Sequence, residues 1–167
     1  MPYQAPADTR VGHVHLRVSD LERAVRFYRD ALGFKVQERY GSQAAFLSAG
    51  GYHHHIGLNT WQSRGGAPAP GGHTGLYHVA FLYPTLEDLR QAAASVAAAG
   101  THIYGAADHG VSVALYFDDP NGNGVELYWD RAPEDWPRDA GGAIKMVNAR
   151  FDIPAFLETG DYRVSRN

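Results

Sequence analysis

Three side chains far apart in the chain, His13, His78 and Glu126, are of the types that can jointly bind a divalent metal ion. Two imidazoles and one carboxylate on one face of a metal leave three coordination positions open. A substrate can chelate through these positions, and beside Fe(II) molecular oxygen can bind as well. The chain has nine histidines and no cysteine, so nitrogen and oxygen atoms must supply every ligand.

An internal repeat supports grouping these residues. At an offset of 65 residues, "HVHLRVSDLER" lies over "HVAFLYPTLED" and His13 meets His78. Asp20 and Thr85 share a position in which either can cap a helix, and helical periodicity continues from each of them to a glycine. Each half is therefore predicted to contain a strand, a helix and three further strands, as a duplicated module would.

The repeat also predicts the elements and the boundaries. Strands are expected at 34–40, 43–48 and 53–59 in the first half, and at 101–105, 111–118 and 124–129 in the second. The predicted divisions are a first module at 10–61, a Gly/Pro linker at 62–75, a second module at 76–131 and a C-terminal tail at 132–167. A half of about 65 residues can scarcely bury a sufficient core alone, so the two sheets should combine. The tail is expected to form packing or interface material.

The alternation of side chains along a strand orients the candidate ligands. The apolar residues of the strand that begins at Val14 are expected to face the first helix, which turns His13 and His15 to the opposite face. His78 and Glu126 likewise turn away from the helices. A strand histidine is commonly a structural residue and a strand glutamate is commonly exposed. A carboxylate within V-E-L-Y-W is costly to bury unpaired, however, and the equivalent positions of the two histidines in a repeat favour a metal site.

The overall composition excludes several classes of function. With 44% hydrophobic and 20% charged residues, the 167-residue chain has the composition of a globular protein. Its net charge is −3 and it has no basic stretch, so nucleic acid is not an expected partner. No apolar run approaches the roughly 20 residues that span a bilayer, so a membrane is not expected either. The absence of cysteine fits a cytoplasmic location.

Three stretches, "GHVHLRVSDLERAVRFYRDALGF", "YHVAF" and "DPNGNGVELY", together resemble the vicinal oxygen chelate superfamily. This superfamily includes glyoxalases, bleomycin- and fosfomycin-resistance proteins and extradiol dioxygenases, and the resemblance covers residues 10–131. It implies an α+β fold in which two βαβββ modules form a cup-shaped mixed sheet around a divalent metal. Carried over by position, the implied ligands are His13, His78 and Glu126, and His15 is the rival to His13.

Within the superfamily, "HHHIGL" resembles a stretch of extradiol dioxygenases whose second histidine is an acid–base catalyst. That histidine would be His54, and His53 and His55 would point to the opposite face. Glyoxalases carry a further metal-ligating carboxylate in this part of the fold. This chain has no Asp or Glu between Gln43 and Trp61, and a histidine is expected in the position of that carboxylate.

Two further positions agree with the extradiol branch. Tyr116, ten residues before Glu126, matches an active-site tyrosine, and His109 lies near where those enzymes keep a substrate-contacting histidine. Both could instead be structural, as we interpret His73 and His102 to be. The resemblance implies an enzyme that cleaves a catechol-like vicinal diol with O2. Fe(II) is the metal that it implies first, with Mn, Ni or Zn as alternatives.

Other members of the superfamily provide the competing hypotheses. A glyoxalase-type isomerase would need Ni or Zn and a fourth protein ligand, for which His54 is the candidate. A fosfomycin-type transferase shares the two-His-one-Glu set but uses Mn and a thiol, and a drug-binding resistance protein works without metal. The linker at 62–75 permits a cup closed within one chain or between two, and a homodimer is expected.

Overall fold

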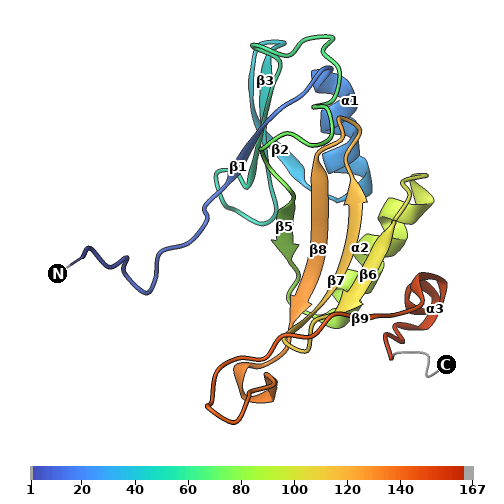
Figure 1. Ribbon diagram of the computed structural model, residues 1–167. Helices are drawn as coiled ribbons and strands as arrows, with labels where there is room; N and C mark the ends of the chain where they lie inside the picture. The colour runs from blue at the N-terminus through green and yellow to red at the C-terminus, as the bar shows by residue number, and fades with distance from the viewer. Residues whose placement is uncertain (1, 164–167) are drawn as a thin grey trace.

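Two separate β-sheets, one from each copy of the repeat, form the framework of the computed structural model, which describes residues 2–163 (Figure 1). The first sheet has the order β1-β4-β3-β2 and the second the order β5-β8-β7-β6-β9. The strands of the first sheet are β1 (Val14–Arg17), β2 (Lys35–Tyr40), β3 (Ala44–Ser48) and β4 (Ile56–Asn59). Those of the second are β5 (Val79–Leu82), β6 (Gly105–Asp108), β7 (Ser112–Asp118), β8 (Gly124–Asp130) and β9 (Ala149–Arg150).

The two sheets are built on the same plan, which confirms the predicted α+β fold of two repeated modules. In each, the first strand runs parallel to the last strand of its module: Val14 pairs with Ile56 and Val79 pairs with Val125. The other pairs within each module are antiparallel. Within residues 2–163 no strand of one sheet pairs with a strand of the other. The two sheets therefore do not combine by strand pairing.

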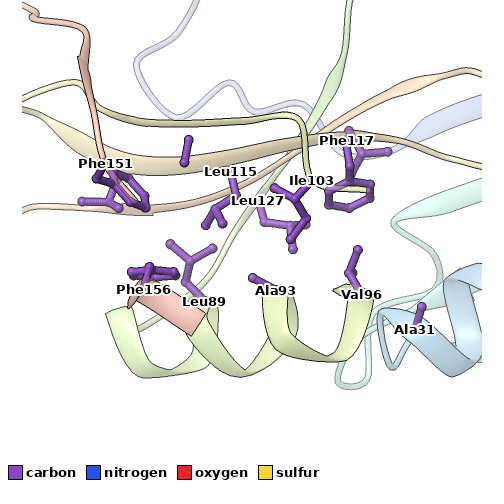
Figure 2. Packing of buried hydrophobic residues seen from close by; sticks show 13 residues of the cluster. Ala31, Leu89, Ala93, Val96, Ile103, Leu115, Phe117, Leu127, Phe151 and Phe156 are labelled. Carbon is purple, nitrogen blue, oxygen red and sulfur yellow. The ribbon is translucent and has the colours of Figure 1, made fainter. Parts of the chain in front are cut away.

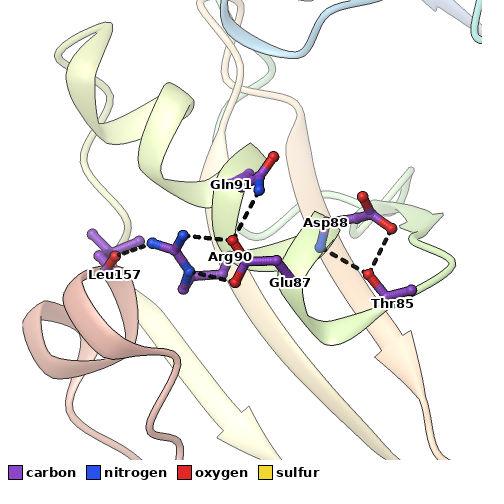
Figure 3. Close-up of polar contacts among 6 residues, drawn as sticks. All are labelled: Thr85, Glu87, Asp88, Arg90, Gln91 and Leu157. Carbon is purple, nitrogen blue, oxygen red and sulfur yellow. Dashed lines mark hydrogen bonds and ion pairs between the residues drawn. The ribbon is translucent and has the colours of Figure 1, made fainter.

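One helix covers the inner face of each sheet. The helical segments are α1 (Leu21–Arg26), its π-helical continuation η1 (Phe27–Ala31), α2 (Leu86–Ala98), the short 3₁₀ turn η2 (Pro133–Asp135) and α3 (Ile153–Thr159). The predicted caps are present: the side chains of Asp20 and Thr85 accept hydrogen bonds from the N–H groups of Arg23 and Asp88 (Figure 3 shows the second). None of the helices within residues 2–163 combines the length and apolar character needed to cross a bilayer.

The hydrophobic core has two parts that meet at the first helix. In the second module, Leu89 and Val96 of α2 pack toward the β-sheet, where Leu115 and Leu127 are fully buried (Figure 2). The first module has its own cluster between its sheet and α1. Three side chains pack against both clusters: Phe27, Leu32 and Phe81. The expected joint core thus arises through the first helix.

A buried polar contact also joins the modules. The turn between β7 and β8 places Asp119 under η1, where the hydroxyl of Tyr28 donates to its carboxylate at 3.0 Å. The side chain of Asn121 accepts from the backbone N–H of Ser19 at 2.9 Å. Burial, followed by the charge of Asp119, raises the pKa of Tyr28 well above its usual range, so this hydroxyl stays a donor. The "DPNGNG" stretch therefore has a structural role at the module junction.

Two of the predicted strands differ from the structure. β6 spans Gly105–Asp108 instead of 101–105, although its sequence, GAAD, has low strand propensity. Pairing with β7 on one side and β9 on the other overrides that propensity. β4 begins at Ile56 instead of residue 53, so the three consecutive histidines precede the strand.

The tail packs against the second module, as one of its two expected roles required. β9 pairs with the outer edge of β6, and α3 buries Phe156 against the core. A guanidinium N–H of Arg90 donates to the carbonyl oxygen of Leu157 at 2.8 Å, which ties α2 to α3 (Figure 3). Residues 164–167 of the predicted tail lie outside the described residues.

The junction between β8 and the tail depends on an ion pair that predicts a stability effect. Arg131 donates to both carboxylate oxygens of Asp108 at 2.7 and 2.9 Å, and both side chains are largely buried. Burial alone would raise the pKa of Asp108, but hydrogen bonds from Arg131 and from the N–H of Gly110 outweigh it and lower the pKa. We expect Asp108→Asn to reduce the free energy of unfolding at neutral pH by about 1–3 kcal/mol.

The sign of the pH dependence follows from the lowered pKa. The contribution of the carboxylate is complete above its unfolded pKa of about 3.9 and is lost as the pH falls through the folded value. Urea unfolding at pH 7 and pH 3 should therefore separate the variant from the native chain only at the higher pH. The control is Asp30→Asn, because the Arg29–Asp30 pair is exposed and should contribute little. Equal effects of the two substitutions at pH 7 would contradict the prediction.

Candidate metal and substrate site

His78 and Glu126, two of the three predicted ligands, lie side by side. His78 immediately precedes β5, and Glu126 lies on the adjacent parallel strand β8, where it pairs with Ala80. The Nε2 atom of His78 is 2.9 Å from Oε2 of Glu126. The glutamate side chain is only 12% exposed, and within residues 2–163 no Lys or Arg pairs with it. The two atoms that face each other are donors suited to a divalent metal.

A glycine makes this close approach possible. A Cβ atom at Gly124 would lie 2.2 Å from the carbonyl oxygen of Tyr77 and 3.2 Å from Cβ of His78. Any side chain at this position would therefore push β8 away from the residue that carries the imidazole. The sequence signal was the last glycine of "DPNGNG", although its role here could not be inferred from the motif alone.

Tyr116 and His109 extend the pair into a hydrogen-bonded chain. The hydroxyl of Tyr116 donates to Oε1 of Glu126 at 3.0 Å. Nε2 of His109 lies 2.8 Å from the same hydroxyl oxygen, so it must be the donor if the hydroxyl proton points to the carboxylate. Burial first, and then the charge of Glu126, raise the pKa of Tyr116 well above its usual range. Tyr116 therefore remains a neutral donor beside the carboxylate.

The third predicted ligand, His13, lies with the first module and contacts the predicted catalyst. The rings of His13 and His54 are 4.4 Å apart between centroids, and Phe46 packs beside His54 at 5.1 Å. Burial first, and then repulsion by His13 and other histidines, lower the pKa of His54. Within residues 2–163 no three His, Asp or Glu side chains gather closely enough to hold a metal ion. One chain thus presents the candidate ligands as a His–Glu pair and a separate histidine.

The expected alternation of the three consecutive histidines is wrong. Nδ1 of His53 lies 2.7 Å from Nδ1 of His54, so these two side chains are neighbours instead of pointing to opposite faces. The reason is that β4 begins only at Ile56, and the pleat that would separate them is absent. Nδ1 of His55 turns away to the hydroxyl of Ser48 at 2.9 Å.

Strand register also corrects the position that was compared with the glyoxalase carboxylate. β1 pairs with β4 as β5 pairs with β8, so the counterpart of Glu126 in the first module is Gly57, not a histidine. The counterpart of Tyr116 is Phe46, which pairs with Gly57 as Tyr116 pairs with Glu126. The first module therefore carries no carboxylate at the equivalent point of its sheet.

His15, the rival ligand, occupies the space above this glycine. A Cβ atom at Gly57 would lie 2.9 Å from Cγ and Cδ2 of the His15 ring. The ring packs between Phe46 and Trp61, at centroid distances of 5.8 and 5.6 Å. Burial, with a smaller effect of His13, lowers the pKa of His15. Its surroundings are those of a packed aromatic side chain on the same face as His13.

A cavity of about 700 Å³ opens beside the His–Glu pair. His78, His109 and Tyr116 line it from the sheet of the second module, and Asn148 and Arg150 line it from the tail. A second hollow of about 510 Å³ beside the start of α1 contains none of the predicted site residues. His73 and His102 are exposed and outside both, in agreement with a structural interpretation.

A duplicated βαβββ module that presents a histidine and a glutamate on adjacent parallel strands defines the vicinal oxygen chelate class of proteins. The chain belongs to the Glyoxalase/Bleomycin resistance protein/Dioxygenase superfamily, whose family model matches residues 10–127. A crystal structure of a glyoxylase/bleomycin resistance protein/dioxygenase domain from Frankia sp. EAN1pec is similar, with a TM-score of 0.62 and 26% identity. The similarity covers 74% of this chain and 98% of that one.

Two curated relatives carry dioxygenase names. The chain is 48% identical over 99 residues to a catechol-2,3-dioxygenase of Bacillus subtilis (strain 168), covering 59% of this chain. It is 36% identical over 123 residues to biphenyl-2,3-diol 1,2-dioxygenase 3 of Rhodococcus globerulus, covering 72% of this chain. The chain spans only 35% of the length of the first relative and 63% of the second.

Proposed function

We propose that this protein is a metal-dependent extradiol dioxygenase that opens the ring of a catechol-like vicinal diol. The observation that carries the proposal is the pair of His78 and Glu126, held by Tyr116 at the wall of a cavity large enough for an aromatic ring. The names of the relatives supply the reaction class, since they are dioxygenases of catechol and of biphenyl-2,3-diol.

We propose further that a second copy of the chain supplies His13 to the same site. Within residues 2–163, β1 and β5 each pair on one side only, and His13 and His78 lie at the starts of these two open edges. Exposed apolar side chains flank the β5 edge: Leu76, Tyr77 and Leu82. Unpaired edges and exposed apolar groups are features that a partner covers. In a twofold dimer, each first module would meet the second module of the other copy, giving two equivalent sites.

The residues of this site have distinct roles in the proposed reaction. His13, His78 and Glu126 would hold a divalent metal, Fe(II) or Mn(II), which supplies positions for both diol oxygens and for O2. His54, beside His13, would accept a hydroxyl proton of the diol and later return it. Tyr116 and His109 would donate hydrogen bonds to oxygen atoms on which negative charge develops. Both atoms of O2 enter the product, and the ring bond next to the diol carbons breaks.

The first module argues against a glyoxalase-type site. Such a site would need a further carboxylate opposite Glu126, where the strand register places Gly57 under the ring of His15. A glutamate at that position would clash with the imidazole before it reached a metal. The alternatives that use a thiol or no metal remain as outcomes of the experiment below.

The test is anaerobic loading with Fe(II) or Mn(II), followed by exposure of catechol and substituted catechols to air. We expect a yellow ring-opened product and the uptake of one O2 for each diol consumed. His54→Ala should retain the bound metal and lose turnover by about 100-fold or more, because only the proton-transfer group is removed. Failure of every metal and diol to consume oxygen would overturn the proposal, and turnover of a thiol adduct without oxygen would assign the protein to the isomerase branch.

A further inference from the structure

The C-terminal tail, beyond the residues matched by the family model, forms one wall of the cavity. β9 extends the sheet at the outer edge of β6, with Arg150 opposite Ala107. The N–H of Val147 donates to the carbonyl oxygen of His109 at 3.0 Å, which fixes the segment next to the predicted site. The tail is thus in register with the strands that carry the catalytic candidates.

The strand register places Arg150 on the same face as Tyr116 and Glu126. Arg150, Ala107 and Ala114 lie in one row across the sheet, because each pairs with the next. Tyr116 lies two residues from Ala114 along β7 and therefore on the same face. Since Ala107 and Ala114 have only methyl side chains, the space between Arg150 and the Tyr116 row is left for a ligand.

The distance across the sheet matches a substituted aromatic ring. Arg150 and Glu126 are three strands apart, which corresponds to about 14 Å between their Cα atoms at the usual strand spacing. Both side chains extend into this span from its two ends. A diol that is bound near Glu126 would therefore direct its ring and a short side chain toward the guanidinium.

Charge defines what that side chain should be. Within the described residues, Arg150 is the only Lys or Arg that lines the cavity, and no carboxylate lies within ion-pair distance of it. Asp118, the acidic group on the same wall, accepts from Tyr104 at the other end of β7. Asn148, two residues before Arg150, adds a carboxamide on the same face of the tail. A guanidinium and a carboxamide together suit a carboxylate.

We propose that the preferred substrate is a vicinal diol whose ring carries a short anionic side chain, a carboxylate, which Arg150 binds. This inference rests on the proposed dioxygenase function for the diol end of the ligand. The carboxylate end depends on the tail alone.

The test compares dihydrocaffeate with 4-propylcatechol, which differ in a carboxylate but match in length. In the metal-loaded protein, kcat/KM should favour dihydrocaffeate by about tenfold, as expected for one charge-assisted contact at a partly exposed site. Arg150→Gln should remove this preference and leave 4-propylcatechol unchanged. The control is Arg138→Gln, an exposed arginine of the same tail that donates to the carbonyl oxygen of Gly142 outside the cavity. The preference should also shrink at high salt, which screens exposed charges.

The outcomes separate this inference from the proposed function. Equal kcat/KM for the two diols, or an equal loss for both in Arg150→Gln, would overturn the carboxylate site and leave the dioxygenase intact. If neither diol is turned over, ligand-observed NMR with phenylpropionate decides the inference without activity. Binding that Arg150→Gln abolishes and Arg138→Gln preserves supports the site, and the absence of such binding overturns it.

Discussion

Glu126→Gln is expected to abolish metal binding and turnover while the fold is retained. A carboxamide of the same shape can still accept from Tyr116, but it lacks the charge that a divalent ion needs. Loss of a residue that merely supports a ligand commonly costs about 10–100-fold in metal affinity, so loss of a ligand itself should cost more than about 100-fold. Mn(II) titration followed by electron paramagnetic resonance measures the affinity, and oxygen uptake measures turnover.

The stability of the metal-free protein distinguishes a ligand from a structural residue. The Glu126 side chain is 12% exposed, and its partners are a hydroxyl and the imidazole of His78. A buried carboxylate without a full counter-charge is costly, so the amide should leave the free energy of unfolding unchanged or increase it. Glu158→Gln, at an exposed position on α3, is the control for both measurements. A large loss of stability with unchanged metal affinity would assign Glu126 a structural role.

The sequence was sufficient to predict the parts of this site that depend on local pattern. The alternation of side chains turned His78 and Glu126 away from the apolar face, and the repeat placed their strands in equivalent positions. Tyr116 was found because strands β7 and β8 form a short antiparallel pair, so a fixed spacing along the chain becomes a fixed contact. These features require only strand geometry and were therefore accessible without coordinates.

The parts that depend on register and strand limits could not be predicted in the same way. Starting β4 at residue 53 made His53 and His54 alternate, whereas the strand begins three residues later and they are neighbours. The same error hid Gly57, because the counterpart of Glu126 can be identified only from which residue pairs with which. Strand ends are set by pairing and by neighbouring packing, which the local sequence does not encode.

The contribution of the tail was underestimated for a different reason. Its sequence has no motif, and β9 is only two residues long. Its position is fixed by contacts distant in sequence, including the Asp108–Arg131 ion pair and the hydrogen bonds of His109 with Val147. Arg150 therefore reaches the cavity through the fold, and its composition alone would make it one more surface arginine. A short polar segment outside a family match can still carry specificity.

Mixing two inactive variants, His13→Ala and Glu126→Gln, is expected to restore activity if each site is shared between two copies. In a mixed dimer, one site combines the intact His13 of one chain with the intact His78 and Glu126 of the other. Random assembly makes half of the dimers mixed, and each contains one intact site of two, so about a quarter of wild-type activity should return. Co-expression of differently tagged chains, followed by tandem affinity purification, isolates the mixed dimer.

The matched control uses two residues of the same half-site. His78→Ala mixed with Glu126→Gln should remain inactive, because these side chains lie 2.9 Å apart in one chain and no assembly can reunite intact copies. Recovery in the first mixture alone requires that His13 act across the dimer. Purified mixed dimers of His13→Ala and Glu126→Gln without activity would instead require that one chain close its own cup. In that case the first module must move so that His13 reaches the His–Glu pair, because within residues 2–163 no three such ligands converge.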